Sequence, residues 1–128
     1  MGIELLFVGI GGSIGSICRF LLTKLAIYLG FVFPLGTLVS NVLAGILVGL
    51  VFGVEKQLGF SPRVILMIRT GFLGGLSTFS TFSFETVHLA QRGLYGEAGL
   101  NIALNLILSL AGVLLGLHLA KTYLLTTG

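Results

Sequence analysis

Charged residues are scarce in this sequence. Only 9% of its 128 residues are Asp, Glu, Lys or Arg, whereas 55% are hydrophobic and the mean hydropathy is +1.13. A soluble domain of this size needs more charged surface, since soluble domains average about 25% charged residues. The composition therefore excludes a soluble domain and indicates an integral membrane protein.

The residues of common catalytic and metal sites are also rare. The single cysteine, Cys18, excludes an intrachain disulfide and a cysteine metal cluster. His88 and His118 are 30 residues apart and match no ligand spacing. The sequence has no nucleophile–base pair or phosphate-binding loop, and its net charge of +3 is scattered without a basic run. We therefore expect neither an enzyme nor a nucleic-acid-binding protein.

Long hydrophobic runs take the place of the missing polar surface. Apolar and polar residues do not alternate strictly, which argues against a β-barrel. At roughly 20 residues per span, the length predicts four transmembrane helices. Residues 1–20 lack a basic start and a clear cleavage site, so they are taken as membrane helix rather than signal peptide. The prediction is one all-α membrane domain, residues 1–128, with spans at about 3–29, 35–54, 62–91 and 98–123.

The basic residues are divided almost evenly between the two ends of these spans. One side carries Lys56, Arg63 and Lys121, with Arg69 extending back toward Arg63; the other carries Lys24 and Arg92, with Arg19 near it. Such a weak bias predicts insertion in both orientations, which permits an antiparallel two-fold dimer. Four short helices also enclose little volume for a pore, so we expect oligomerisation.

The first two spans each contain one strongly polar residue. Arg19 follows a glycine-rich segment whose small residues allow close helix packing. An arginine here most often extends to the membrane interface, which we favour from the residues alone, although it can also line an anion vestibule. Asn41 is either a hydrogen-bonding contact between helices or a pore residue whose amide donates to an anion.

The third span contains the segment around which the chain is organised, RTGFLGGLSTFSTFSFE at residues 69–85. Its glycines and hydroxyl residues predict a break near mid-membrane, and irregular backbone persists there only when buried in protein or lining a polar cavity. Backbone carbonyls freed between Gly74 and Ser77 could bind a cation.

Phe79 and Phe82 lie three residues apart and so share a helical face. They either pack against other helices or present their positive ring edges to a small anion, with Ser80 and Thr81 as hydroxyl donors beside them. The fourth span carries a polar stripe at Asn101, Asn105 and Ser109, which is either a packing contact or one wall of a hydrated path.

Three segments of the chain resemble the Fluc/CrcB fluoride channel family. They are GGSIGSICRF (residues 11–20), PLGTLVSN (34–41) and GFLGGLSTFSTFSFE (71–85), which occur in family order and cover nearly the whole length. The resemblance implies a small bacterial protein of the cytoplasmic (inner) membrane that spans the lipid bilayer several times. It implies an antiparallel, dual-topology homodimer that confers fluoride resistance by exporting fluoride passively through two pores, with a structural sodium ion at the dimer centre.

The resemblance also assigns roles to individual residues. The fluoride pore residues are Phe79, Phe82, Asn41, Ser80, Thr81, Ser109 and Arg19, and the sodium ligands are the backbone carbonyls of Gly74 and Ser77. Arg19 thereby becomes a vestibule residue, and Glu85 matches the acidic residue after the motif. Two positions depart from the family: Ser77 replaces a threonine, and the fourth span carries asparagines where tyrosine or serine is usual.

Two other functions are considered. A proton-coupled multidrug-type exporter also has four spans, but it needs a membrane-embedded carboxylate in the first span, where this chain has only Glu4 at the mouth. A non-transporting assembly subunit would use its glycines and hydroxyls for packing alone. Flux measurements on purified protein in liposomes separate the three.

Overall fold

The computed structural model describes residues 1–124, which form four helical segments long and apolar enough to cross a membrane, as predicted. The elements in chain order are α1 (Gly2–Tyr28), α2 (Leu35–Leu58), α3 (Pro62–Leu66), η1 (Met67–Leu73), α4 (Gly74–Leu76), α5 (Phe79–Gln91), α6 (Tyr95–Leu119) and η2 (Ala120–Leu124). The second helix runs to Leu58 rather than to the predicted residue 54, because the polar residues before Gly59 continue it to a left-handed glycine cap.

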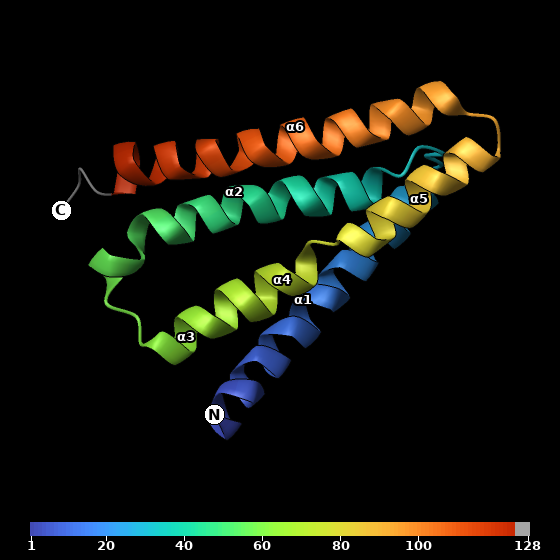
Figure 1. The fold of residues 1–128 in the computed structure, drawn as a ribbon. Helices are drawn as coiled ribbons and strands as arrows, with labels where there is room; N and C mark the ends of the chain where they lie inside the picture. Colours follow the sequence, from blue (N-terminus) through green and yellow to red (C-terminus); the bar gives the residue numbers. More distant parts are fainter. Residues whose placement is uncertain (125–128) are drawn as a thin grey trace.

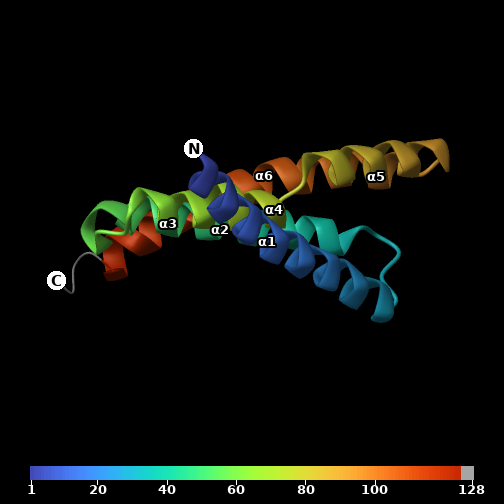
Figure 2. The ribbon, with the colours of Figure 1, turned by 90° about the horizontal axis from the view of Figure 1, so that it is seen from below.

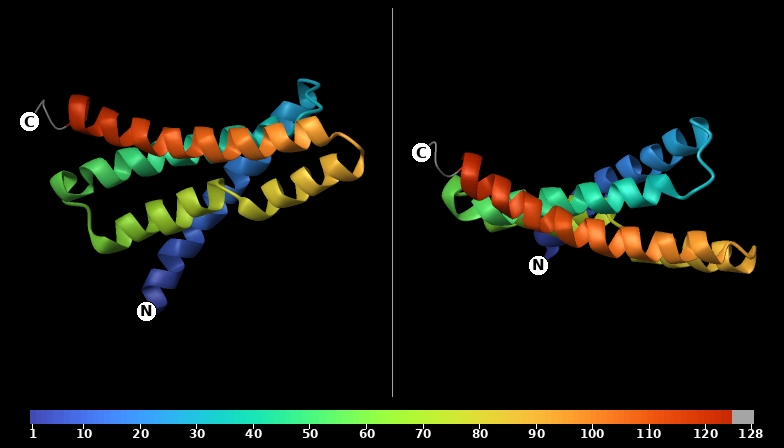
Figure 3. Two further views of the ribbon diagram at one scale, coloured as in Figure 1. Left: turned by 45° about the horizontal axis from the view of Figure 1, so that its top comes forward. Right: turned by 90° about the horizontal axis from the view of Figure 1, so that it is seen from above.

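The four pieces of the third span lie against different neighbours. α2 and α6 lie side by side and run in the same direction (Figure 1). α5 lies beside the first half of α6, whereas η1 and α4 lie against α1, which crosses them obliquely (Figures 1 and 3). Seen from below, α5 and the end of α1 diverge (Figure 2). The first half of the third span therefore contacts α1, and its second half contacts α6.

Glycines set the distance between α1 and the third span. A side chain on Gly11 or Gly15 would collide with main-chain oxygens of η1. From the opposite side, a Cβ on Gly75 would lie 2.6 Å from the Gly12 oxygen. The small residues of the first span thus allow backbone-to-backbone contact, and this contact positions the segment that precedes the break.

Glycines also allow close contact between α2 and α6. A Cβ on Gly45 of α2 would lie 2.7 Å from the Ser109 oxygen of α6, and side chains on Gly49 and Gly116 would also collide with the facing helix. Away from these contacts the helices expose large apolar side chains such as Ile107 and Leu114. Such a surface is suited to lipid, since a bilayer solvates apolar side chains.

The third span is irregular over a longer stretch than the break itself. Residues 67–73 form the wide turns of a π-helix, with Gly71 buried against α1. π-turns occur mostly as short insertions in α-helices and frequently at functional sites. Leu73 and Leu76 follow and pack with Ala44 of α2 as the buried core of the molecule.

Candidate functional site

The helix of the third span stops at Leu76 and starts again at Phe79. Ser77 (φ −82°, ψ 154°) and Thr78 (φ −151°, ψ 124°) are extended, which locates the predicted interruption. The Thr78 hydroxyl accepts a hydrogen bond from the Thr81 amide at 3.1 Å and so caps α5. Threonine is a good N-cap, because its oxygen replaces an acceptor that the new helix lacks.

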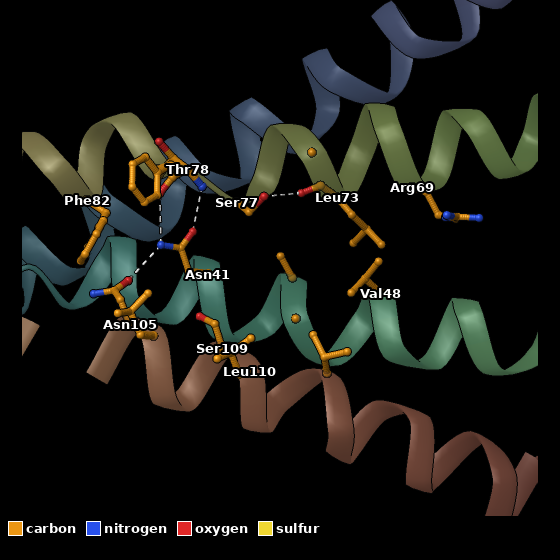
Figure 4. Close-up of a pocket in the computed structure, with 16 residues that line it drawn as sticks. Asn41, Val48, Arg69, Leu73, Ser77, Thr78, Phe82, Asn105, Ser109 and Leu110 are labelled. Carbon is orange, nitrogen blue, oxygen red and sulfur yellow. Dashed lines mark hydrogen bonds between the residues drawn. The ribbon is translucent and has the colours of Figure 1, made fainter. Parts of the chain in front are cut away.

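Asn41 of α2 holds the break in place. Its Oδ1 accepts from the Thr78 amide at 2.7 Å, and its Nδ2 donates to the Thr78 carbonyl at 3.2 Å and to Asn105 Oδ1 at 2.9 Å (Figure 4). One side chain therefore satisfies both main-chain polar groups of Thr78. Without partners in an apolar membrane interior, these groups would destabilise the fold. Both amide hydrogens of Asn41 are engaged.

The two asparagines of the fourth span continue this network inside the protein. Asn105 is 4% exposed and donates to the carbonyl and side-chain oxygens of Asn101, at 2.9 and 3.0 Å. Asn101 is fully buried and donates to Thr86 Oγ1 of α5 at 2.9 Å. These hydrogen bonds make Asn101 a packing contact, whereas Asn105 both packs and lines the cavity described next.

Ser109 behaves differently from these asparagines. Its Oγ is buried yet makes no hydrogen bond within residues 1–124. Ser109 borders a cavity of about 470 Å³ between α2, α6 and the third span (Figure 4). A buried hydroxyl left without a partner is uncommon and calls for an explanation such as a bound ion or water.

This cavity, called the central pocket below, contains most of the residues that the sequence analysis singled out. It is lined by Asn41, Gly74, Ser77, Phe79, Phe82 and Ser109 among the predicted residues, and by Ala44, Gly45, Val48, Arg69, Leu73, Thr78, Asn105, Leu106, Leu110 and Val113 besides. Three predicted residues, Arg19, Ser80 and Thr81, do not line it. The break thus brings the second, third and fourth spans to one hollow.

The two phenylalanines share a helical face but not an environment. Their ring centroids are 5.6 Å apart and the ring planes are tilted by 53°. Phe82 is 8% exposed, whereas Phe79 is 75% exposed within this single chain. Phe82 is therefore held by the protein's own packing, and the Phe79 ring is open to a neighbouring molecule.

The three residues outside the central pocket surround the break on other sides. Arg19 of α1 donates from Nε to the Gly75 carbonyl at 3.1 Å, so extension to the membrane interface does not describe its whole role. Thr78 Oγ1 donates to Thr81 Oγ1 at 3.1 Å and lies 3.4 Å from the exposed Ser80 hydroxyl. The vestibule role that the resemblance assigns to Arg19 stays a prediction.

The carbonyls predicted to hold sodium lie beside the pocket. In a regular helix the Thr78 amide would donate to the Gly74 carbonyl, but here it donates to Asn41. The interruption therefore removes the usual helical donor of Gly74. Within residues 1–124 no cluster of three His, Cys, Asp or Glu side chains is arranged to hold a metal, so main-chain oxygens are the candidate ligands.

One charged residue of the pocket was not predicted to be part of the site. Arg69 was expected to extend toward Arg63, and its guanidinium does point away from the break. Its Nη1 lies 3.1 Å from Glu55 Oε2 of α2, and the guanidinium is 4.4 Å from the centre of the Phe52 ring. The sequence analysis gave Arg69 no partner, because the carboxylate that it contacts lies on the preceding span. The position of Arg69 inside a membrane span could have identified it as a candidate site residue, since intramembrane charges usually have functional partners.

A second polar pair was also missed. Glu85 was matched to the acidic residue after the motif without a partner, and the structure shows the Thr37 hydroxyl of α2 donating to its Oε1 at 2.5 Å. Thr37 is 2% exposed, and Glu85 Oε2 is buried without a hydrogen bond in the described part of the chain. The two residues are 48 positions apart, and no local pattern in the sequence connects them.

Comparison with known proteins agrees with the resemblance. Residues 6–117 match the family model described as "CrcB-like protein, Camphor Resistance (CrcB)". Over 117 residues the chain is 43% identical to the protein named fluoride-specific ion channel FluC from Shewanella woodyi, 44% to that of Shewanella loihica and 45% to that of Shewanella oneidensis. Each alignment covers 91% of this chain and 94% of the Shewanella woodyi and Shewanella loihica relatives. The expectation of a non-enzymatic protein agrees with these names, and the chain belongs to the CrcB-like family of fluoride-specific ion channels.

Proposed function

We propose that this protein is a fluoride channel that exports toxic fluoride passively across the bacterial cytoplasmic membrane. The proposal is supported by the names of its relatives and by one observation above others, the unsatisfied Ser109 hydroxyl in a pocket beside a broken helix. Fluoride is a small, strongly hydrogen-bonding anion. A hydroxyl donor in such a pocket can replace part of its hydration.

Two kinds of group would stabilise the ion in the pocket. Ser109 supplies an O–H donor, and the rings of Phe79 and Phe82 supply positive edges. Asn41 contributes only if fluoride competes with Asn105 for one amide hydrogen, because both hydrogens are engaged. We therefore assign Asn41 first to holding the break and second to the ion path.

The working unit in this proposal is an antiparallel homodimer inserted in both orientations. The weak bias of basic residues permits both orientations. The Phe79 ring is largely exposed in one chain, and a second copy would enclose it. Two copies would provide two pores related by the two-fold axis.

The sodium ion belongs to the same proposal. Gly74, exposed and without its helical donor from Thr78, offers a carbonyl oxygen, and Ser77 is extended beside it. Cations such as sodium are bound by cages of carbonyl oxygens, and two breaks meeting across a dimer axis would supply more oxygens than one. The Ser77 hydroxyl donates to Leu73, so the substitution of threonine by serine leaves the carbonyl unaffected.

Flux from proteoliposomes tests the function. Vesicles loaded with potassium fluoride and treated with valinomycin should release fluoride at a rate that depends on the protein and not on a proton gradient. Chloride-loaded vesicles should release little anion. Absence of fluoride release would favour a subunit that does not transport, and proton-driven drug uptake would favour an exporter; either result would overturn the proposal.

Exchange of sodium for a large organic cation tests the proposed sodium site. Exhaustive removal of sodium should abolish flux or dissociate the dimer, as measured by fluoride release and by size-exclusion chromatography. Returning sodium should restore both. Flux and assembly unchanged after complete exchange would leave the carbonyls at Gly74 and Ser77 without the proposed ion.

A further inference from the structure

We infer that Arg69 supplies the positive charge that draws anions into the central pocket, and that Glu55 sets the strength of that charge. This inference rests on the proposed function and adds a residue to the ion path. Among the residues that line the pocket in the described chain, Arg69 is the single charged one. Every other lining group is apolar or an uncharged polar group.

Arg69 also lies at a junction. A second hollow of about 410 Å³ adjoins the turn between α2 and α3, and among residues 1–124 only Arg69 lines both hollows. Glu55 and Lys56 are the other charged residues that line the second hollow. Figure 4 shows its guanidinium directed along the third span, away from the break. An anion passing from the turn into the central pocket would therefore pass this charge.

The surroundings of Arg69 hold its guanidinium at this junction. Glu55 contacts Nη1 through both oxygens, at 3.1 and 3.3 Å, and the Phe52 ring lies beneath the guanidinium. Arg69 is 35% exposed and Glu55 is 19% exposed, so neither is fully shielded. The pair keeps a charged group stable seven residues inside a membrane span that begins at Pro62, where charge is costly.

The same pair reduces the field that an anion experiences. A guanidinium and a carboxylate in contact nearly cancel at a distance, whereas a lone cation attracts anions across a region of low dielectric. Removal of the carboxylate should therefore increase the attraction, and removal of the guanidinium should abolish it. A purely structural ion pair behaves otherwise, because loss of either partner breaks the same contact.

Opposite effects of Glu55→Gln and Arg69→Gln are the test. At fluoride concentrations well below saturation, Glu55→Gln should raise the rate of fluoride release about fivefold and Arg69→Gln should lower it by a similar factor. Arg63→Gln and Glu97→Gln remove the same charges at exposed positions outside both hollows and serve as matched controls. Both effects should shrink at high ionic strength.

Chemical labelling of a thiol at position 69 tests the effect of charge within a single variant. Arg69→Cys is made together with Cys18→Ala, which removes the single native cysteine. The reconstituted protein is then labelled with a cationic or an anionic methanethiosulfonate, and labelling is confirmed by mass spectrometry. Protein that carries the cationic label should release fluoride about tenfold faster than protein that carries the anionic label.

The outcomes separate the inference from the function on which it rests. Fluoride release by the unmodified protein, with equal losses in Glu55→Gln and Arg69→Gln and equal rates for the two adducts, would overturn the role of Arg69 and leave the channel intact. No fluoride release by the unmodified protein would overturn both. If Arg69 variants fail to fold, a rate in Glu55→Gln at or below that of the unmodified protein still contradicts the inference.

Discussion

The two halves of the third span are attached to the rest of the protein by different physical means. Before the break, η1 and α4 touch α1 backbone to backbone through Gly11, Gly15 and Gly75. After the break, α5 is bound to α6 by the hydrogen bond from Asn101 to Thr86 and to α2 by the hydrogen bond from Thr37 to Glu85. Close approach of small residues and interhelical hydrogen bonds are the two main stabilising contacts within a bilayer.

This difference explains where the central pocket lies. Main-chain contact holds the first half close to α1, whereas the asparagine network holds the second half against α6, so the chain must change direction between them. Asn41 binds both polar groups of Thr78 at the point of change. The pocket is the space left beside that turn, and its properties depend on both attachments.

The largest effect is expected in the first half, from Gly15→Ala. The new methyl group would collide with the Phe72 oxygen, which belongs to the main chain and has little freedom to move. We expect a loss of about 3 kcal/mol or more, seen as aggregation on size-exclusion chromatography. Gly9→Ala is the control, because a methyl group there meets nothing within 4 Å; equal behaviour of the two variants would contradict the close contact.

The next effect is expected in the second half, at the phenylalanines. Phe82→Ile and Phe79→Ile keep apolar bulk but remove the ring edge, which should lower fluoride release about tenfold, since aromatic contacts contribute about 0.5–1.5 kcal/mol. Because Phe82 is buried within a single chain, Phe82→Ile should also lower thermal stability. Undiminished release in both variants, with the dimer intact, would count against ring-edge stabilisation of the anion.

A smaller effect is expected from the network that holds the second half. Asn105→Ala should cost about 1–2 kcal/mol, because it leaves Asn41 and Asn101 with unsatisfied groups. Thr86→Ala, at the far end of the network, should cost less. If the network acts as a unit, the double variant should lose less than the sum of the two, as measured by denaturation in detergent; strict additivity would indicate independent contacts.

The smallest effect is expected at the turn itself. Thr78→Ala removes the cap of α5 and should cost about 1 kcal/mol, whereas Thr78→Ser should retain most of the stability. Ser83→Ala is a suitable control, because its hydroxyl bonds within its own helix to the Phe79 carbonyl. Stability equal in the alanine and serine variants would show that Asn41 alone determines the turn.

The sequence predicted the class of protein and the place of its irregularity. Few charges and long apolar runs indicated four membrane helices, because these properties are local and additive along the chain. The same is true of the interruption at Ser77 and Thr78, where adjacent glycines and hydroxyls weaken the helix. Resemblance to a known family, rather than periodicity, supplied the proposed ion.

The partners of the polar residues were decided by tertiary structure alone. Asn41 binds Thr78 across 37 residues, Arg19 binds Gly75 across 56, and Arg69 binds Glu55 across 14. Helical periodicity gives the direction of a side chain around its own axis but not the helix that faces it. That choice depends on how closely the glycines of α1 and α2 allow their neighbours to approach, and so it is made only when the whole chain packs.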